Sequence, residues 1–150
     1  MDIASLEAEA ARLFLPRFDE DTALQLGLIL LDLAKGKPVV INIRNAHRTY
    51  FHAALPGSQA NNDGWARRKG NTTLLHGAAS MYVTLRYAER ERTLTTDGVS
   101  GADYALAGGA VPIRITGTGL VAVATISGLP EQEDHALVVA GIELLMARLS

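Results

Sequence analysis

Two pairs of short apolar segments in this chain are joined by connections too short for a helical crossover. The first pair spans residues 39–43 and 49–55, and the second spans 111–115 and 120–126. Parallel strands need a crossover of about a dozen residues, whereas antiparallel strands need only a tight turn. Each pair is therefore predicted to form an antiparallel hairpin, so the sheet should be mainly antiparallel.

Helices are expected before, between and after these hairpins. Apolar residues at helical spacing, with acidic residues in the first turns, predict helices over 2–14 and 20–35. A long helix should begin near Trp65 and reach about Arg90, and Pro130 suits the first turn of a final helix. The glycine-rich stretch 93–109 is interpreted as a loop with one helical turn at 102–106.

The order of these elements favours an α/β (α+β) layered fold over a doubly wound nucleotide fold. No β-helix-β crossover is repeated, and the two hairpins lie between helices, so helices should flank the sheet. A length of 150 residues with 48% hydrophobic residues is typical of one domain, here 1–150, with one core.

Composition excludes several partners and locations. A formal net charge of -2 provides no broad cationic field for a nucleic-acid backbone. The acidic N-terminus does not resemble a secretory signal, and the most apolar stretch, 23–34, is too short for a membrane span. With no cysteine in the chain, a cytoplasmic protein without nucleic-acid or membrane partners is expected.

The second predicted helix is apolar nearly all round. One packed face does not explain leucine or isoleucine at so many of its positions, which are Leu24, Leu26, Leu28, Ile29, Leu30, Leu31 and Leu33. Part of this helix is therefore expected to contact another subunit, which predicts a homo-oligomer.

Three motifs resemble a known family. They are PGS at 56–58 followed by WARRK at 65–69, GGAVPI at 108–113, and SGLPEQEDH at 127–135. Together they resemble the uncharacterised-protein branch of the haem-degrading domain superfamily, and the resemblance covers nearly the whole chain. Relatives in that superfamily include glycolate-utilisation accessory proteins and the C-terminal domain of one type of cobalamin adenosyltransferase.

This resemblance implies a five-stranded antiparallel sheet flanked by helices, a profilin-like arrangement and symmetric oligomers. The sequence pattern gives four clear strands, so the fifth is expected within 93–100, where residues 93–96 have weak strand character. Some superfamily members bind haem, which makes haem a ligand that the resemblance implies. No axial ligand of those members matches a particular residue here.

The first candidate site comprises Trp65, Arg68, Lys69 and His76, with Arg67 and Asn71 nearby. An aromatic ring with cations at the start of a helix suits a carboxylate, a phosphate or a haem propionate. The alternative is a solvated helix face, or inter-subunit ion pairs around a packed tryptophan. His76 follows Trp65 by about three helical turns, so both should face one side. Its imidazole suits haem iron, or it is a hydrogen-bonded structural residue.

The second candidate site is the acidic start of the final helix, with Glu131, Asp134 and His135 beside Glu133. Glu131 and His135 stand at i and i+4, on one helix face, and suit a divalent metal or acid/base work. The alternative is that the carboxylates stabilise the helix dipole while the histidine makes a local hydrogen bond. The remaining histidines, His47 and His52, are interpreted as structural.

Three functions follow from these patterns. The leading hypothesis is an oligomeric protein that binds a small ligand or cofactor, either haem or another anionic, partly aromatic molecule. The second is an accessory or scaffold protein that acts through protein interfaces. The third is a metal-dependent enzyme that uses Glu131, Asp134 and His135. The usual hydrolase signatures, GxSxG and HExxH, are missing from the chain.

Overall fold

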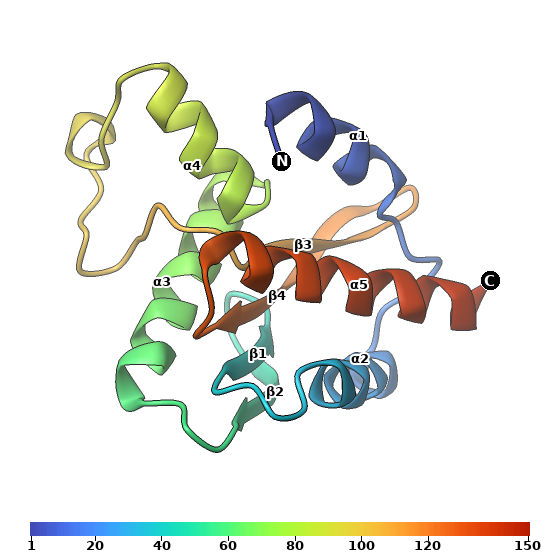
Figure 1. The fold of residues 1–150 in the computed structure, drawn as a ribbon. Coiled ribbons are helices and arrows are strands. Elements are labelled where there is room, and N and C mark those ends of the chain that lie inside the picture. The colour runs from blue at the N-terminus through green and yellow to red at the C-terminus, as the bar shows by residue number, and fades with distance from the viewer.

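A computed structural model describes all residues, 1–150. Five α-helices, four strands and one short 3-10 helix follow one another along the chain (Figure 1). Their bounds are α1 Ile3–Arg12, α2 Glu20–Leu33, β1 Val40–Arg44, β2 Thr49–Ala54, α3 Ala60–His76, α4 Ser80–Glu89, η1 Thr95–Asp97, β3 Ala110–Ile115, β4 Gly119–Ser127 and α5 Glu131–Leu149. No helix has the length and apolar character that crossing a membrane requires.

The four strands form one sheet in the order β2-β1-β4-β3, and every neighbouring pair is antiparallel. The two predicted hairpins are confirmed as the outer pairs of the sheet. Their inner strands join through the β1–β4 pair, in which Ile41 lies opposite Ile126. An α+β fold with an antiparallel sheet between helices is therefore present, as the sequence predicts.

Helices pack on both faces of the sheet (Figure 1). Helices α2 and α5 pack together on one face, where Leu26 and Leu30 meet Ile142 and the inward side chains of β1. Helix α3 covers the other face, and its buried residues include Lys69, Thr72 and Thr73. Because buried polar groups need partners, these side chains make specific hydrogen bonds, and Thr72 and Thr73 donate to the carbonyls of Ala105 and Ala110.

The prediction of a fifth strand is wrong, because the sheet has four strands. Residues 93–100 contain the 3-10 helix η1, and the Thr93 backbone N–H donates to the Thr96 hydroxyl at 3.0 Å. Such local side-chain bonds offer the backbone an alternative to strand pairing. The edge strand β3 gains only an isolated parallel bridge, between Ile115 and Leu15. The expected helical turn at 102–106 is also misplaced, since it lies at Thr95–Asp97.

The predicted helix from Trp65 to Arg90 is two helices. Gly77 ends α3 in the left-handed conformation, with φ of 68°, and its N–H donates to the Thr73 carbonyl. Glycine adopts this conformation without the penalty of a side chain. The chain then turns through Ala78 and Ala79, and α4 begins at Ser80.

Candidate functional site

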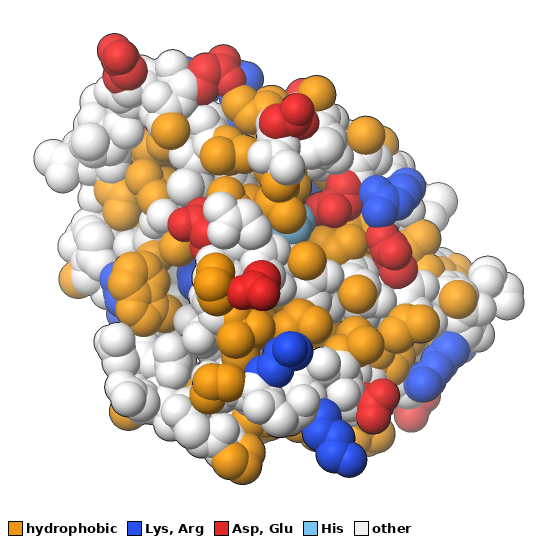
Figure 2. Space-filling view, in the orientation of Figure 1, with side chains coloured by type: hydrophobic (Ala, Val, Ile, Leu, Met, Phe, Trp, Pro, Cys, Tyr) orange, Lys and Arg blue, Asp and Glu red, His pale blue; other side chains and the backbone are white.

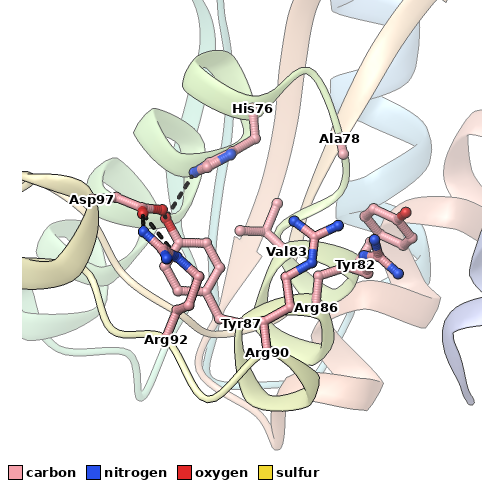
Figure 3. A pocket seen from close by; sticks show the side chains of 9 residues that line it. All are labelled: His76, Ala78, Tyr82, Val83, Arg86, Tyr87, Arg90, Arg92 and Asp97. Carbon is pink, nitrogen blue, oxygen red and sulfur yellow. Dashed lines mark hydrogen bonds and ion pairs between the residues drawn. The ribbon is translucent and has the colours of Figure 1, made fainter.

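A cleft of about 560 Å³ lies between the end of α3, helix α4 and the turn that follows it (Figure 3). The break at Gly77 creates it by letting α4 turn away from the axis of α3. The Ser80 hydroxyl, which is buried, accepts a hydrogen bond of 3.0 Å from Ala110 N–H and so fastens the start of α4 to β3. The lining residues are His76, Ala78, Tyr82, Val83, Arg86, Tyr87, Arg90, Arg92 and Asp97.

A chain of three polar side chains forms one wall of this cleft. The buried Tyr87 donates its phenol proton to the Asp97 carboxylate, and its oxygen lies 3.4 Å from His76 Nε2. The His76 and Tyr87 rings meet edge to face, with centroids 5.7 Å apart. Because the single phenol proton goes to Asp97, the tyrosine oxygen is left to accept from His76. With its Nε2–H directed at Tyr87, the imidazole has its lone pair on Nδ1, the nitrogen that is left to bind a ligand.

The environment holds Tyr87 neutral. Burial, the hydrogen bond to Asp97 and the charge of that carboxylate together raise the pKa of Tyr87 to about 12. Conversely, the hydrogen bond from Tyr87 and a second from Arg92 lower the pKa of Asp97. The wall therefore presents a neutral phenol beside an ionised carboxylate at neutral pH.

Three arginines give the cleft a positive character. Arg92 pairs with Asp97, and Arg86 lies 3.6 Å from Glu89 on the same helix. Arg90 has no ion-pair partner. Figure 3 shows the Arg86 and Arg90 side chains near Tyr82 and Val83, among the residues that line the cleft. Guanidinium groups recognise carboxylates and phosphates through paired N–H donors.

Sequence analysis did not single out these arginines, Tyr87 or Asp97. The available signal is the spacing of Arg86 and Arg90 at i and i+4, since these positions share one face of a helix. Arginines at this spacing usually lie on a solvated helix face. The spacing therefore indicates a binding site only when His76 is known to lie beside it.

The four residues of the first predicted site are not brought together. Trp65 and Lys69 line a smaller pocket of about 250 Å³ beside Asp134. His76 instead lies in the cleft lined by Arg86, Arg90 and Arg92, which we call the arginine cleft. Eleven residues of helix separate Trp65 from His76 by about 16 Å, more than a shared small pocket spans. Arg68 stacks on the Trp65 ring at 4.2 Å and donates to the Gly101 carbonyl.

Lys69 is committed to a buried ion pair. Its ammonium nitrogen lies 3.0 Å from Asp134 and 3.3 Å from the Ile126 carbonyl, and the residue is 4% exposed. Asp134 also accepts hydrogen bonds from the backbone N–H groups of Leu129 and Gly128. Burial raises the pKa of Asp134, against the opposite effects of Lys69 and these N–H donors. The expected anion-binding lysine thus already has a carboxylate partner.

The second predicted site is also divided. Asp134 faces Lys69, but the fully buried His135 lies with its Nε2 2.6 Å from Glu9 of α1 and has no partner at Nδ1. Glu131 lines the small pocket beside Asp134. Consecutive helical residues point about 100° apart, which explains the divergence. No group of three or more potential metal ligands occurs in the structure, so the metal site has no geometric support.

Comparison with known proteins decides the family. Residues 18–143 match the model of the family described as haem degrading protein HbpS-like. The chain belongs to this HbpS-like family. The sequence resemblance to the haem-degrading superfamily is thereby confirmed.

Relatives of this HbpS-like chain are similar over nearly its whole length. A UPF0303 protein of Streptomyces avermitilis is 42% identical over 149 residues, covering 97% of this chain and 91% of the relative. The crystal structure of Ybr137w protein superposes with a TM-score of 0.89 at 30% identity, covering 97% of this chain and 88% of that one. The crystal structure of a PduOC:heme complex shares the fold, with a TM-score of 0.71 at 18% identity, covering 84% and 93%.

Proposed function

We propose that this protein binds haem, or a porphyrin-like anion of the same shape, in the arginine cleft. The observation that carries the proposal is the position of His76 in one cleft with Arg86, Arg90 and Arg92. Imidazole is a haem iron ligand, and arginines pair with carboxylates such as propionates. The family description and the haem complex of a protein with this fold support the same ligand.

The cleft fits the chemical parts of haem. Its volume of about 560 Å³ lies within the usual range for cofactor sites, roughly 300–1,000 Å³. Tyr82 and Val83 supply apolar surface for a macrocycle, while the arginines supply charge at the opening. Bound haem would contribute an iron centre for redox or small-molecule chemistry, and the protein would contribute ligation and orientation.

His76, rather than Tyr87, is the residue assigned to the iron. A tyrosine ligates haem as a phenolate, and the raised pKa of Tyr87 opposes loss of its proton. Its hydrogen bond to Asp97 instead makes the phenol a support for the imidazole. A hydrogen bond to the ring nitrogen that does not bind the metal orients a ligating histidine. Tyr87 and Asp97 are thus proposed as positioning residues.

A visible absorption titration with haemin tests the proposal. The native protein should give a saturable Soret shift at micromolar haemin, and His76→Ala should lose it. The control is His47→Ala, because His47 is an exposed histidine on the β1–β2 turn. No saturable shift in the native protein, or an equal shift in His76→Ala, would contradict haem ligation here.

Iron-free protoporphyrin separates ligation from charge recognition. It retains both propionates but has no iron, so His76→Ala should bind it as the native protein does. The combined Arg86→Ala and Arg90→Ala changes should weaken both ligands by about tenfold, because charge-assisted hydrogen bonds are removed. Light scattering should show the same particle size for all variants. An arginine variant that binds both ligands as tightly as the native protein does would contradict the assignment of the propionates.

A further inference from the structure

A second cleft, of about 480 Å³, lies between the β1–β2 hairpin and the first half of α3. We call it the hairpin cleft. It is separate from the arginine cleft and shares no lining residue with it. Its lining is almost entirely polar and includes Asn42, Arg44, Arg48, His52, Arg67 and Asn71. Asp63 is the single acidic residue in its wall.

Arg44 is the one arginine of the hairpin cleft that lacks an acidic partner. Its guanidinium donates to Asn71 Oδ1 at 2.7 Å, to the Arg67 carbonyl at 3.2 Å and to the Asn45 carbonyl at 3.3 Å. All three acceptors are neutral. Three of its five N–H donors are therefore used, and its charge is not compensated.

The other two arginines are paired on the rim. Arg48 lies 3.3 Å from Glu20, and Arg67 lies 3.2 Å from Asp103. Both pairs are well exposed, so they are screened by water and contribute little to stability. Arg44 is half-buried at the end of β1, where desolvation makes an uncompensated charge more costly.

Helix α3 contains a glycine at the point where this guanidinium rests. A Cβ at Gly70 would lie 2.9 Å from Arg44 Nη2 and 3.4 Å from both Cζ and Nε. Glycine inside a helix costs about 1 kcal/mol relative to alanine. Gly70 itself is buried, and its lack of a side chain gives the guanidinium its place against the helix.

The surrounding groups keep the site polar and ordered. His52 Nε2 lies 2.7 Å from Asp63, and His52 Nδ1 lies 3.0 Å from the Asn42 amide nitrogen. Asp63 is thus held by the histidine and makes no ion pair with Arg44. Burial, together with the nearby charge of Arg67, lowers the pKa of Arg44, which is the direction expected for a cation without a counter-charge.

We propose that the hairpin cleft binds the oxyanion of a small polar ligand, either a carboxylate or a phosphate, on Arg44. The anion supplies the negative counter-charge that Arg44 lacks within the protein. It also accepts hydrogen bonds from the N–H groups of Arg44 that have no acceptor in the protein. The amides of Asn45 and Asn71 are hydrogen-bonded at both ends within the protein, which leaves the side-chain oxygen of Asn42 to recognise the polar remainder of the ligand. The site is independent of the arginine cleft and of haem.

Calorimetric titration of the full chain with inorganic phosphate and, separately, with succinate tests this site at constant ionic strength. At least one anion should bind saturably, and Arg44→Met should weaken it by about tenfold or more. Arg12→Met is the matched control and should leave the affinity unchanged, because Arg12 is an exposed, paired arginine of α1 that does not line this cleft. Binding of phosphate alone identifies a phosphate site, and binding of succinate alone identifies a carboxylate site.

A second variant keeps the test decisive should Arg44→Met fail to fold. Gly70→Ala retains the arginine but places a methyl group against its guanidinium, so anion affinity should fall while the net charge stays the same. Two results would overturn the proposal. One is the absence of binding for both anions at millimolar concentration, and the other is unchanged affinity in a folded Arg44→Met or Gly70→Ala protein.

Discussion

The ammonium nitrogen of Lys69 lies 3.0 Å from a carboxylate oxygen of Asp134, and the two side chains are 5% and 1% exposed. This contact joins α3 to the start of α5 across 65 residues of sequence. The same carboxylate accepts N–H groups from the β4–α5 connection at Gly128 and Leu129. The pair therefore fixes α3 against the sheet, and α3 supplies residues to both proposed binding clefts.

Removing one partner of this pair should destabilise the fold severely. Lys69→Met leaves a buried carboxylate without its cation, which typically costs about 3–5 kcal/mol. Adding Asp134→Leu removes the uncompensated charge, so the double variant should be more stable than Lys69→Met alone. Urea denaturation gives the free energy of unfolding of the native protein, of Lys69→Met and of the double variant. As a control, Arg12→Ala breaks an exposed pair with Glu143 and should cost less than about 1 kcal/mol. A double variant less stable than Lys69→Met would contradict a buried charge pair.

Alkaline titration should detect the hydrogen bond between Tyr87 and Asp97. The folded pKa of Tyr87, about 12, exceeds its ordinary value of 10.0, so the folded protein retains this proton longer than the unfolded chain. The stabilisation is complete below pH 10 and is lost as pH rises toward 12. Ultraviolet absorbance of phenolate should show a late titration that is absent in Tyr87→Phe and occurs at lower pH in Asp97→Asn, where burial alone still raises the pKa of Tyr87. An unshifted late titration in Asp97→Asn would contradict the assigned partner.

Local sequence signals predict the hairpins and most helix ends. Asp19, for example, caps α2 by accepting the Thr22 N–H, as an aspartate before a helix is expected to do. The failures concern choices between competing local structures. Thr93 and Thr96 have β-branched side chains, but their hydroxyl bonds favour a tight turn over a fifth strand.

The arginine cleft illustrates why a site is harder to predict than a fold. In one continuous helix, His76 and Tyr87 would lie about three turns apart and could not touch. The break at Gly77 turns α4 back, so their ring centroids are 5.7 Å apart. Similarly, Lys69 and Asp134 were both singled out, but in separate sites, because only the tertiary fold pairs them.

A side chain at position 109 should disrupt the buried ion pair. Gly109 has φ of 136°, and a Cβ there would overlap the Ile126 carbonyl oxygen and lie 2.9 Å from Lys69 Nζ. Gly109→Ala should therefore cost about 3 kcal/mol or more in thermal or urea unfolding. Gly101→Ala is the control, because its Cβ would meet open space. Equal stability of the two variants would contradict the close packing around Lys69.

Changes to the exposed leucines should test the predicted homo-oligomer. Helix α2 buries Leu26 and Leu30, but Leu28 is 54% exposed and shares a groove with Leu144 of α5, which is 48% exposed. Hydrophobic side chains gather over these two helices in Figure 2.

Leu28→Gln with Leu144→Gln should lower the molar mass measured by size exclusion with light scattering, since exposed apolar patches mark interfaces. Leu75→Gln is a matched control on α3, where the leucine is 51% exposed. A native protein that elutes as a monomer, or an unchanged mass in the double variant, would contradict assembly through α2 and α5.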